Sequence, residues 1–80
     1  MTHPKILIVD DEATIREILA ILFEQDGYVV ALAEDVSAAK EVFQRFEPDI
    51  VLSDLNMPGE TGIDFLRWVQ EHNTKVPFVI

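Results

Sequence analysis

Apolar positions along this 80-residue chain follow two different spacings that alternate from the N-terminus onward. Short apolar runs predict four β-strands, at residues 6–9, 28–32, 50–53 and 78–80. Apolar residues at helical spacing predict three helices, over residues 13–26, over residues 37–47, and from the loop at residues 56–62 to near residue 73. Gly27 and Pro48 stand where the first two helices should stop. The run at 28–32 is the least continuous of the four, so we expect this strand at an edge of the sheet.

Strands that alternate with helices through short connections predict parallel β-α-β units and an α/β fold with a doubly wound sheet. We expect one domain over residues 1–80, ending within the fourth strand. In such a sheet all strands point the same way, so their carboxyl ends share one edge, and ligands bind there. The first and third strands are expected to flank that binding point.

Composition excludes several classes of function. Fifteen acidic residues against six basic ones give a formal charge of -9, the wrong sign for direct binding to nucleic acid or an anionic membrane. The chain has no cysteine, which excludes disulfide and thiolate chemistry. The N-terminus lacks the apolar run of a signal peptide, and no run is long enough to cross a bilayer. We therefore expect a cytoplasmic location.

The candidate chemistry lies in three aspartates at predicted strand ends. Asp10 and Asp11 follow the first strand, and Asp54 follows the third. Three carboxylates that meet at one edge repel one another unless a cation lies between them. Oxygen ligands without His or Cys suit Mg²⁺. Next to such an ion, an aspartate is able to act as a nucleophile on phosphorus, and Asp54 is the candidate.

Each of these residues also has a plainer interpretation. Acids before the first helix interact favourably with its dipole, and a lone Asp commonly opens a loop through an Asx-turn. The spatial combination of the three aspartates is what favours the site. A flavin or dinucleotide site is disfavoured, because the loop after the first strand has no glycine.

Several other polar and aromatic residues have no expected role in the site. Charged residues of the first helix are expected on a solvated face, namely Arg16, Glu17 and Glu24. His3 and His72 are expected to be exposed, and Trp68 is expected to pack on the core side of its helix.

The segments ILIVDDE at 6–12 and DIVLSDLNMPGETG at 49–62 together resemble the receiver domain of two-component response regulators. This resemblance implies a flavodoxin-like sheet with strand order 2-1-3-4. It implies that Asp54 accepts a phosphoryl group from a sensor histidine kinase or a phosphotransfer protein. Such a protein is a signalling module that at most phosphorylates and dephosphorylates itself, and is not an enzyme.

The same resemblance implies a set of metal ligands. Asp11 and Asp54 would bind Mg²⁺ directly, Asp10 would act through water, and Asn56 would supply its backbone carbonyl. Pro58 and Gly59 would shape the loop.

The family pattern continues beyond residue 80, with a Ser or Thr, a Lys, and a further strand and helices. We therefore expect marginal folding and an open edge on the fourth strand, in a truncated receiver that either associates through that edge or is part of a longer protein. One alternative is a degenerate receiver that serves only as an interaction or oligomerisation module. Another is a phosphatase or phosphotransferase of the haloacid dehalogenase type, but that family has a second Asp where this chain has Asn56.

Overall fold

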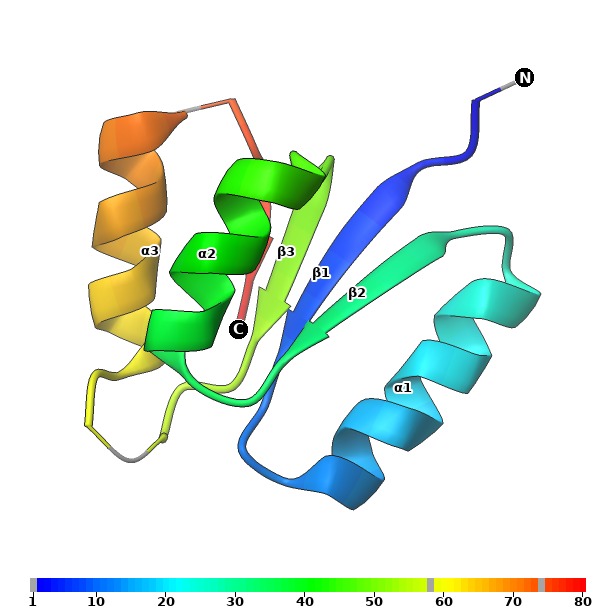
Figure 1. Ribbon diagram of the computed structural model, residues 1–80, viewed down its shortest axis with the longest axis horizontal. Coiled ribbons are helices and arrows are strands. Elements are labelled where there is room, and N and C mark those ends of the chain that lie inside the picture. Colours follow the sequence, from blue (N-terminus) through cyan, green and yellow to red (C-terminus); the bar gives the residue numbers. More distant parts are fainter. Residues whose placement is uncertain (1, 58, 74) are drawn as a thin grey trace.

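The computed structural model describes residues 2–57, 59–73 and 75–80, and these form an α/β fold with one parallel sheet (Figure 1). Its strands are β1 (Lys5–Val9), β2 (Val29–Ala33), β3 (Ile50–Ser53) and β4 (Phe78–Val79). Its helices are α1 (Ala13–Gln25), α2 (Val36–Phe46) and α3 (Gly62–His72). The strand order is β2-β1-β3-β4, which confirms the expected topology and the edge position of β2.

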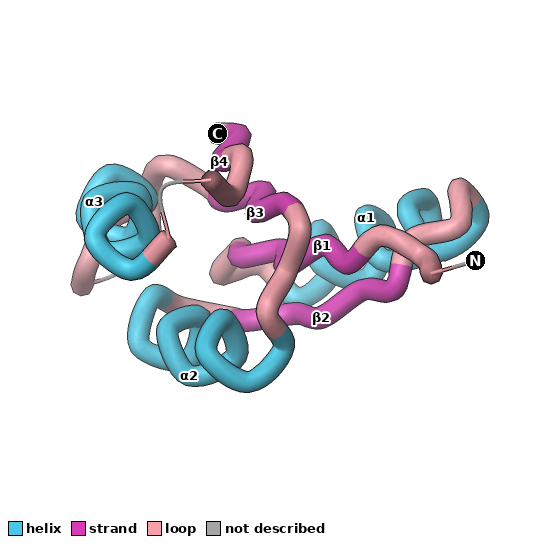
Figure 2. The backbone as a smooth tube through the Cα atoms, turned by 90° about the horizontal axis from the view of Figure 1, so that it is seen from above, coloured by secondary structure: helices cyan, strands magenta, loops and turns pink. Residues whose placement is uncertain are grey.

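The sheet separates two helical layers. Helices α2 and α3 cover one face and α1 lies on the other (Figure 2). Leu7 is in register with Val51, and Ile8 with Leu52, so residues at matched positions of β1 and β3 share a face. Because all the strands are parallel, the loops that follow them meet at one edge of the sheet, the lower edge in Figure 1.

Local signals explain where the helices begin and end. The Asp35 side chain accepts a hydrogen bond from the Ala38 amide at 2.8 Å, and α2 starts at the next residue after this N-cap. At its other end, Glu47 adopts a left-handed conformation with φ 52° before Pro48. Gly27, with φ 92°, follows the end of α1. The predicted boundaries of these two helices are therefore right to within one residue.

The main core lies between the sheet and the α2–α3 layer. Its buried residues come from every strand except β4, from both helices and from the β3–α3 loop: Leu7, Val9, Ala33, Val36, Ala39, Phe43, Val51, Met57, Phe65 and Val69. The Phe65 ring lies 6.4 Å from the Phe43 ring and 5.6 Å from the Phe78 ring, both edge to face. Trp68 stacks on Phe65 at 6.0 Å, which confirms its expected role in packing.

The opposite face of the sheet is covered less well. Helix α1 packs on β1 and β2, and none of its residues is fully buried. Ile18 and Leu22 of α1 are 49% and 55% exposed, and Val79 of β4 is 46% exposed. None of the described helices has the length and apolar content that a membrane span needs. Exposed apolar residues therefore lie on α1, which packs on β1 and β2, and on β4 at the opposite edge of the sheet.

Candidate metal and phosphoryl-acceptor site

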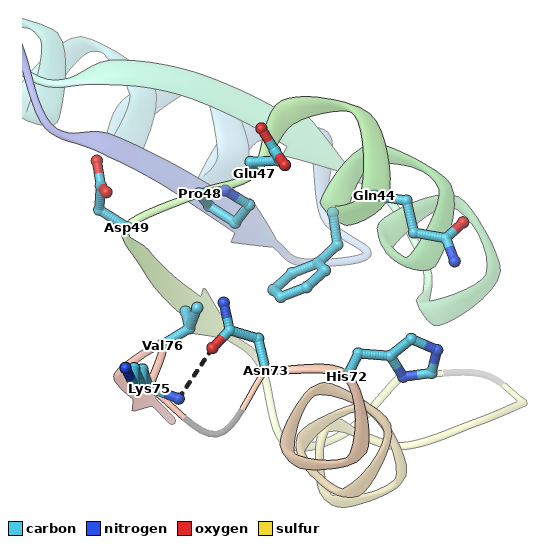
Figure 3. Close-up of a pocket in the computed structure, with 9 residues that line it drawn as sticks. Gln44, Glu47, Pro48, Asp49, His72, Asn73, Lys75 and Val76 are labelled. Carbon is cyan, nitrogen blue, oxygen red and sulfur yellow. Dashed lines mark hydrogen bonds between the residues drawn. The ribbon is translucent and has the colours of Figure 1, made fainter.

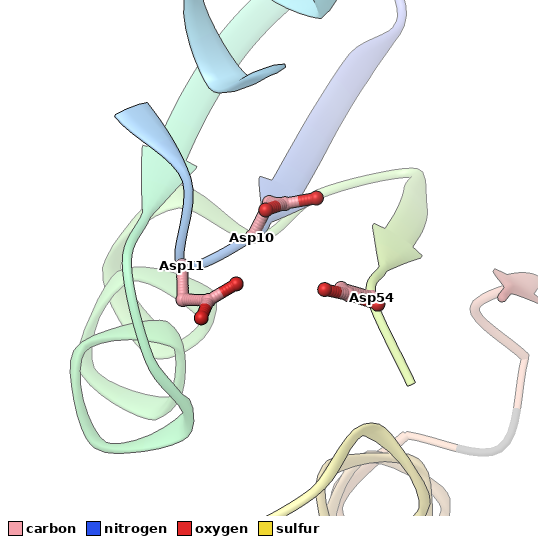
Figure 4. Close-up of side chains that lie close together, drawn as sticks. All are labelled: Asp10, Asp11 and Asp54. Carbon is pink, nitrogen blue, oxygen red and sulfur yellow. The ribbon is translucent and has the colours of Figure 1, made fainter. Parts of the chain in front are cut away.

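The carboxyl ends of β1 and β3 bring three aspartates together (Figure 4). The Asp54 amide donates to the Val9 carbonyl at 2.8 Å, and the Asp10 amide donates to the Ala33 carbonyl at 3.1 Å. These bonds extend the strand ladders by one residue and fix the backbone that carries the acids. One carboxylate oxygen from each of Asp10, Asp11 and Asp54 lies within 4.8 Å of the others. Asp10 and Asp54 are half-buried, whereas Asp11 is exposed.

This donor set fits a magnesium ion. Oxygen ligands lie about 2.1 Å from Mg²⁺, so two ligands on opposite sides of an octahedral ion are roughly 4.2 Å apart. The observed limit of 4.8 Å is slightly wider. A small side-chain rotation, or one ligand acting through water, closes this difference. All three donors are carboxylates, the hard ligands that Mg²⁺ prefers.

Two of the aspartates also shape their own turns. Asp10 Oδ1 accepts from the Glu12 amide at 2.9 Å, and Asp54 Oδ1 accepts from the Asn56 amide at 3.3 Å. The plainer interpretation of Asp54 as a turn residue therefore holds for one of its oxygens, and Asp10 makes a similar turn that was not predicted. Within the described residues, no hydrogen bond engages the Oδ2 atom of either one.

The loop after Asp54 is held close to it by Gly62. The Gly62 amide donates to the Leu55 carbonyl at 3.0 Å. A Cβ at this position would collide with the Asp54 carbonyl oxygen and lie 3.1 Å from Leu55 Cα. The sequence pattern marks Gly62 only as a loop residue, because nothing in that pattern shows that two backbone segments touch.

The remaining loop residues that were predicted to matter are only partly described. Asn56 is exposed beside Asp54, and its proposed carbonyl role stays a prediction. Gly59 adopts φ 79°, a conformation that glycine accepts readily. Pro58 lies outside the described residues.

The start of α3 fixes the far end of this loop. The Asp64 amide donates to Thr61 Oγ1 at 3.3 Å, and the Thr61 amide donates to Asp64 Oδ2 at 2.9 Å, so the two residues form a capping box. The backbone and hydroxyl donors of Thr61 hold the pKa of Asp64 below its ordinary value. This carboxylate therefore stabilises the helix start and takes no part in the metal cluster.

Another contact ties the same loop to α2. Lys40 Nζ lies 3.0 Å from Glu60 Oε2 and 5.9 Å from the centre of the Trp68 ring. The two charged side chains are 29% and 50% exposed. No helical or strand spacing relates residues twenty positions apart, so the sequence carries no local signal for this pair.

One sequence expectation for α1 was wrong. Arg16 was expected on a solvated face, but it is half-buried and its Nη1 donates to the Asp10 carbonyl oxygen at 2.7 Å. The guanidinium therefore holds the backbone of one member of the aspartate cluster. A pattern search at helical spacing misses this bond, because it joins the helix to the strand end six residues earlier.

A hollow at the opposite edge of the sheet is separate from the aspartate cluster. Its volume is about 500 Å³, and it lies between the carboxyl ends of α2 and α3 (Figure 3). His72, one of its lining residues, is exposed as expected and stacks on Trp68 at 3.9 Å. None of the three clustered aspartates lines this hollow.

Comparison with known proteins gives a consistent result. The chain matches the family described as response regulator receiver domain over residues 6–80. It is 39% identical over 80 residues to the phosphate regulon transcriptional regulatory protein PhoB of Pseudomonas aeruginosa, a match that covers 100% of this chain and 35% of PhoB.

Solved structures agree in fold. Chemotaxis protein CheY4 of Vibrio cholerae superposes with a TM-score of 0.93 at 32% identity, covering 96% of this chain and 66% of that one. Response regulator TrrA of Thermotoga maritima, solved with Mg²⁺-BeF, gives a TM-score of 0.85 at 32% identity, with coverages of 89% and 62%.

A doubly wound sheet with three aspartates at the carboxyl ends of its central strands defines a signalling module of the receiver class. The chain belongs to the response regulator receiver domain family of two-component systems. Receiver domains are signalling modules and not classical enzymes, in agreement with the class expected from the sequence. The chain spans about a third of PhoB and about two thirds of CheY4.

Proposed function

We propose that residues 1–80 act as a receiver domain in which Asp54 accepts a phosphoryl group in a Mg²⁺-dependent reaction. The donor is a phosphohistidine of a sensor histidine kinase or of a phosphotransfer protein. The observation that carries this proposal is the convergence of Asp10, Asp11 and Asp54 within 4.8 Å at the ends of two adjacent strands. The receiver family of the chain supports it.

Asp54 is the nucleophile of this proposal. It lies at the end of a central strand, and its backbone is fixed by the bond to Val9. A carboxylate oxygen attacks the phosphorus, and the bond between phosphorus and the imidazole nitrogen breaks. The imidazole keeps the electron pair of that bond and takes up a proton, while Asp54 becomes an acyl phosphate.

Asp11 and Asp54 would hold the ion directly, with the Asn56 carbonyl as a further ligand and Asp10 acting through water. Bound Mg²⁺ would neutralise charge on the phosphoryl oxygens. Asp10 Oδ1 and Asp54 Oδ1 each accept a bond from a backbone amide, so each residue would use its Oδ2 atom toward the ion or its bound water.

The test is intact-mass spectrometry after incubation with acetyl phosphate and MgCl₂. We expect addition of one phosphoryl group to the wild-type chain, and none to Asp54→Asn or in the presence of a chelator. Asp26→Asn removes an exposed acid at the end of α1 and is expected to be labelled like the wild type. A folded wild-type chain that is never labelled would refute the proposal.

We also propose that two copies associate through the outer edge of β4. In the described part of the chain no strand pairs with this edge, and Val79 and Ile80 are 46% and 53% exposed. An open apolar edge favours pairing with another chain. This observation keeps a pure interaction module as the second candidate function.

Sedimentation velocity at micromolar concentration tests this association. We expect a dimer for the wild type and a monomer for Val79→Lys, which places a charge on the edge. A wild-type monomer would contradict association, and a dimer without Asp54 labelling would favour the interaction module.

A further inference from the structure

Among the hydrogen bonds of the described residues, Arg16 is the basic residue whose side chain bonds to a member of the aspartate cluster, at the backbone of Asp10. Its Nη1 donates to the Asp10 carbonyl oxygen at 2.7 Å from the half-buried side of α1. Two other basic side chains bond elsewhere: Lys5 Nζ donates to the Phe46 carbonyl, and Lys40 Nζ pairs with Glu60. A hydrogen bond from a charged donor is shorter and stronger than one between neutral groups.

We propose that Arg16 is a positioning residue for the metal site, an inference that rests on the proposed function of the cluster. Asp10 is held at three points: its amide by Ala33, its Oδ1 by the Glu12 amide, and its carbonyl by Arg16. Of these three, only the Arg16 bond comes from a charged side chain and fixes the carbonyl.

The effect reaches Asp11 through the peptide plane. The peptide between Asp10 and Asp11 is planar, so fixing the direction of its carbonyl also fixes the position of the Asp11 Cα. The Asp11 side chain is exposed and makes no hydrogen bond within the described residues. Its place in the cluster therefore depends on the backbone that Arg16 anchors.

A positioning role and a purely electrostatic role for Arg16 predict opposite changes in Mg²⁺ affinity when Arg16 is substituted. A fixed positive charge close to a cation site repels the cation, so loss of that charge alone would strengthen Mg²⁺ binding. Loss of an anchor weakens binding, because residues that orient metal ligands typically change metal affinity by about 10- to 100-fold when they are substituted. The sign of the change therefore separates the two roles.

The experiment is Mg²⁺ titration of the 80-residue chain by isothermal titration calorimetry. Arg16→Met keeps much of the apolar stem and removes the donor and the charge. Arg16→Gln is a second variant that retains a polar helix former too short to reach the Asp10 carbonyl. Arg45→Met removes the same charge from the last turn of α2, whose carboxyl end lies at the opposite edge of the sheet, and serves as the matched control.

We expect both Arg16 variants to bind Mg²⁺ about 10-fold or more weakly, while Arg45→Met binds like the wild type. Hydrogen exchange of the Glu12 amide should also become faster in the metal-free Arg16 variants. This amide donates to Asp10 Oδ1, and without Arg16 the Asp10 backbone is held less firmly. Unchanged or tighter Mg²⁺ binding in a folded Arg16 variant would overturn the inference.

Failure of the inference about Arg16 can be distinguished from failure of the proposed function. A wild-type chain that binds no Mg²⁺ would overturn the metal site and the role of Arg16 together. A wild-type chain that binds Mg²⁺ and is labelled on Asp54, with Arg16 variants that behave identically, would overturn the Arg16 role alone. If the inference is correct, Arg16→Met is still labelled on Asp54 once the Mg²⁺ concentration is high enough to saturate the weakened site.

Discussion

The contact between Gly62 and Asp54 predicts that a single methyl group disturbs both stability and phosphoryl acceptance. In Gly62→Ala, the new Cβ would collide with the Asp54 carbonyl oxygen and approach Leu55 Cα to 3.1 Å. Both of the groups that it meets are backbone, so neither is able to rotate away. The strand end or the start of α3 has to shift.

The size of the effect follows from three contributions. Overpacking of this kind costs about 1–3 kcal/mol. Stretching the bond from the Gly62 amide to the Leu55 carbonyl, 3.0 Å long in the wild type, adds up to about 1 kcal/mol. The higher helix propensity of alanine offsets at most about 1 kcal/mol of this. We therefore expect a net loss of about 1–3 kcal/mol in the free energy of unfolding.

Gly27→Ala is a matched control. Gly27 has φ 92°, and in the described part of the chain a methyl group there would meet no heavy atom within 4 Å beyond its chain neighbours. Its substitution therefore costs about 1–2 kcal/mol through backbone strain alone. Urea unfolding should show similar losses for both variants, but only Gly62→Ala should also slow the labelling of Asp54 by acetyl phosphate. Equal slowing in both variants would refute the reasoning, as would wild-type stability and labelling in Gly62→Ala.

Three further substitutions test the packing around the site. Phe65→Ala removes a fully buried ring and should lower the free energy of unfolding by about 3–5 kcal/mol, measured by urea denaturation with circular dichroism. Thr61→Ala removes the N-cap hydroxyl of α3. This loss should lower the free energy of unfolding by about 1 kcal/mol. It should also raise the pKa of Asp64 toward its ordinary value, which NMR titration of the carboxyl group measures. Because that pKa is lowered in the folded chain, the stability due to the Asp64 carboxylate is present above the ordinary value and is lost as the pH falls through the lowered one. Lys40→Met breaks a largely exposed ion pair and should change the free energy of unfolding by less than about 1 kcal/mol. A larger loss in urea denaturation would show that the pair also stabilises the loop.

Much of the fold follows from the sequence because its signals are local. Continuous apolar runs mark strands buried in a parallel sheet, and Pro48 and Gly27 mark helix ends that the structure confirms to within one residue. The convergence of the aspartates was also predictable, since the carboxyl ends of parallel strands share one edge.

What the sequence did not reveal depends on which backbone segments touch. Gly62 contacts Asp54 across a loop, and Arg16 reaches back past the helix start to the Asp10 carbonyl. Neither spacing matches the separations of three or four residues that place side chains on one helix face. An exposed charged residue and a half-buried one that anchors a backbone carbonyl look alike in such a pattern, which is why the expectation for Arg16 was wrong.

The site and the weakly covered face of the sheet are linked through the stability of the whole chain. The positions of the three aspartates depend on β1 and β3, the central pair of strands, and on ladder bonds at Asp10 and Asp54. The exposed apolar residues of α1 and β4 leave less of the hydrophobic driving force to hold that pair together. Three nearby carboxylates add repulsion that a bound cation removes. A ligand that binds only the folded state stabilises it by about 2.7 kcal/mol at 100 times its Kd. For a small domain this is a large share of the total free energy of unfolding, so occupancy of the aspartate cluster and folding of the chain should rise together.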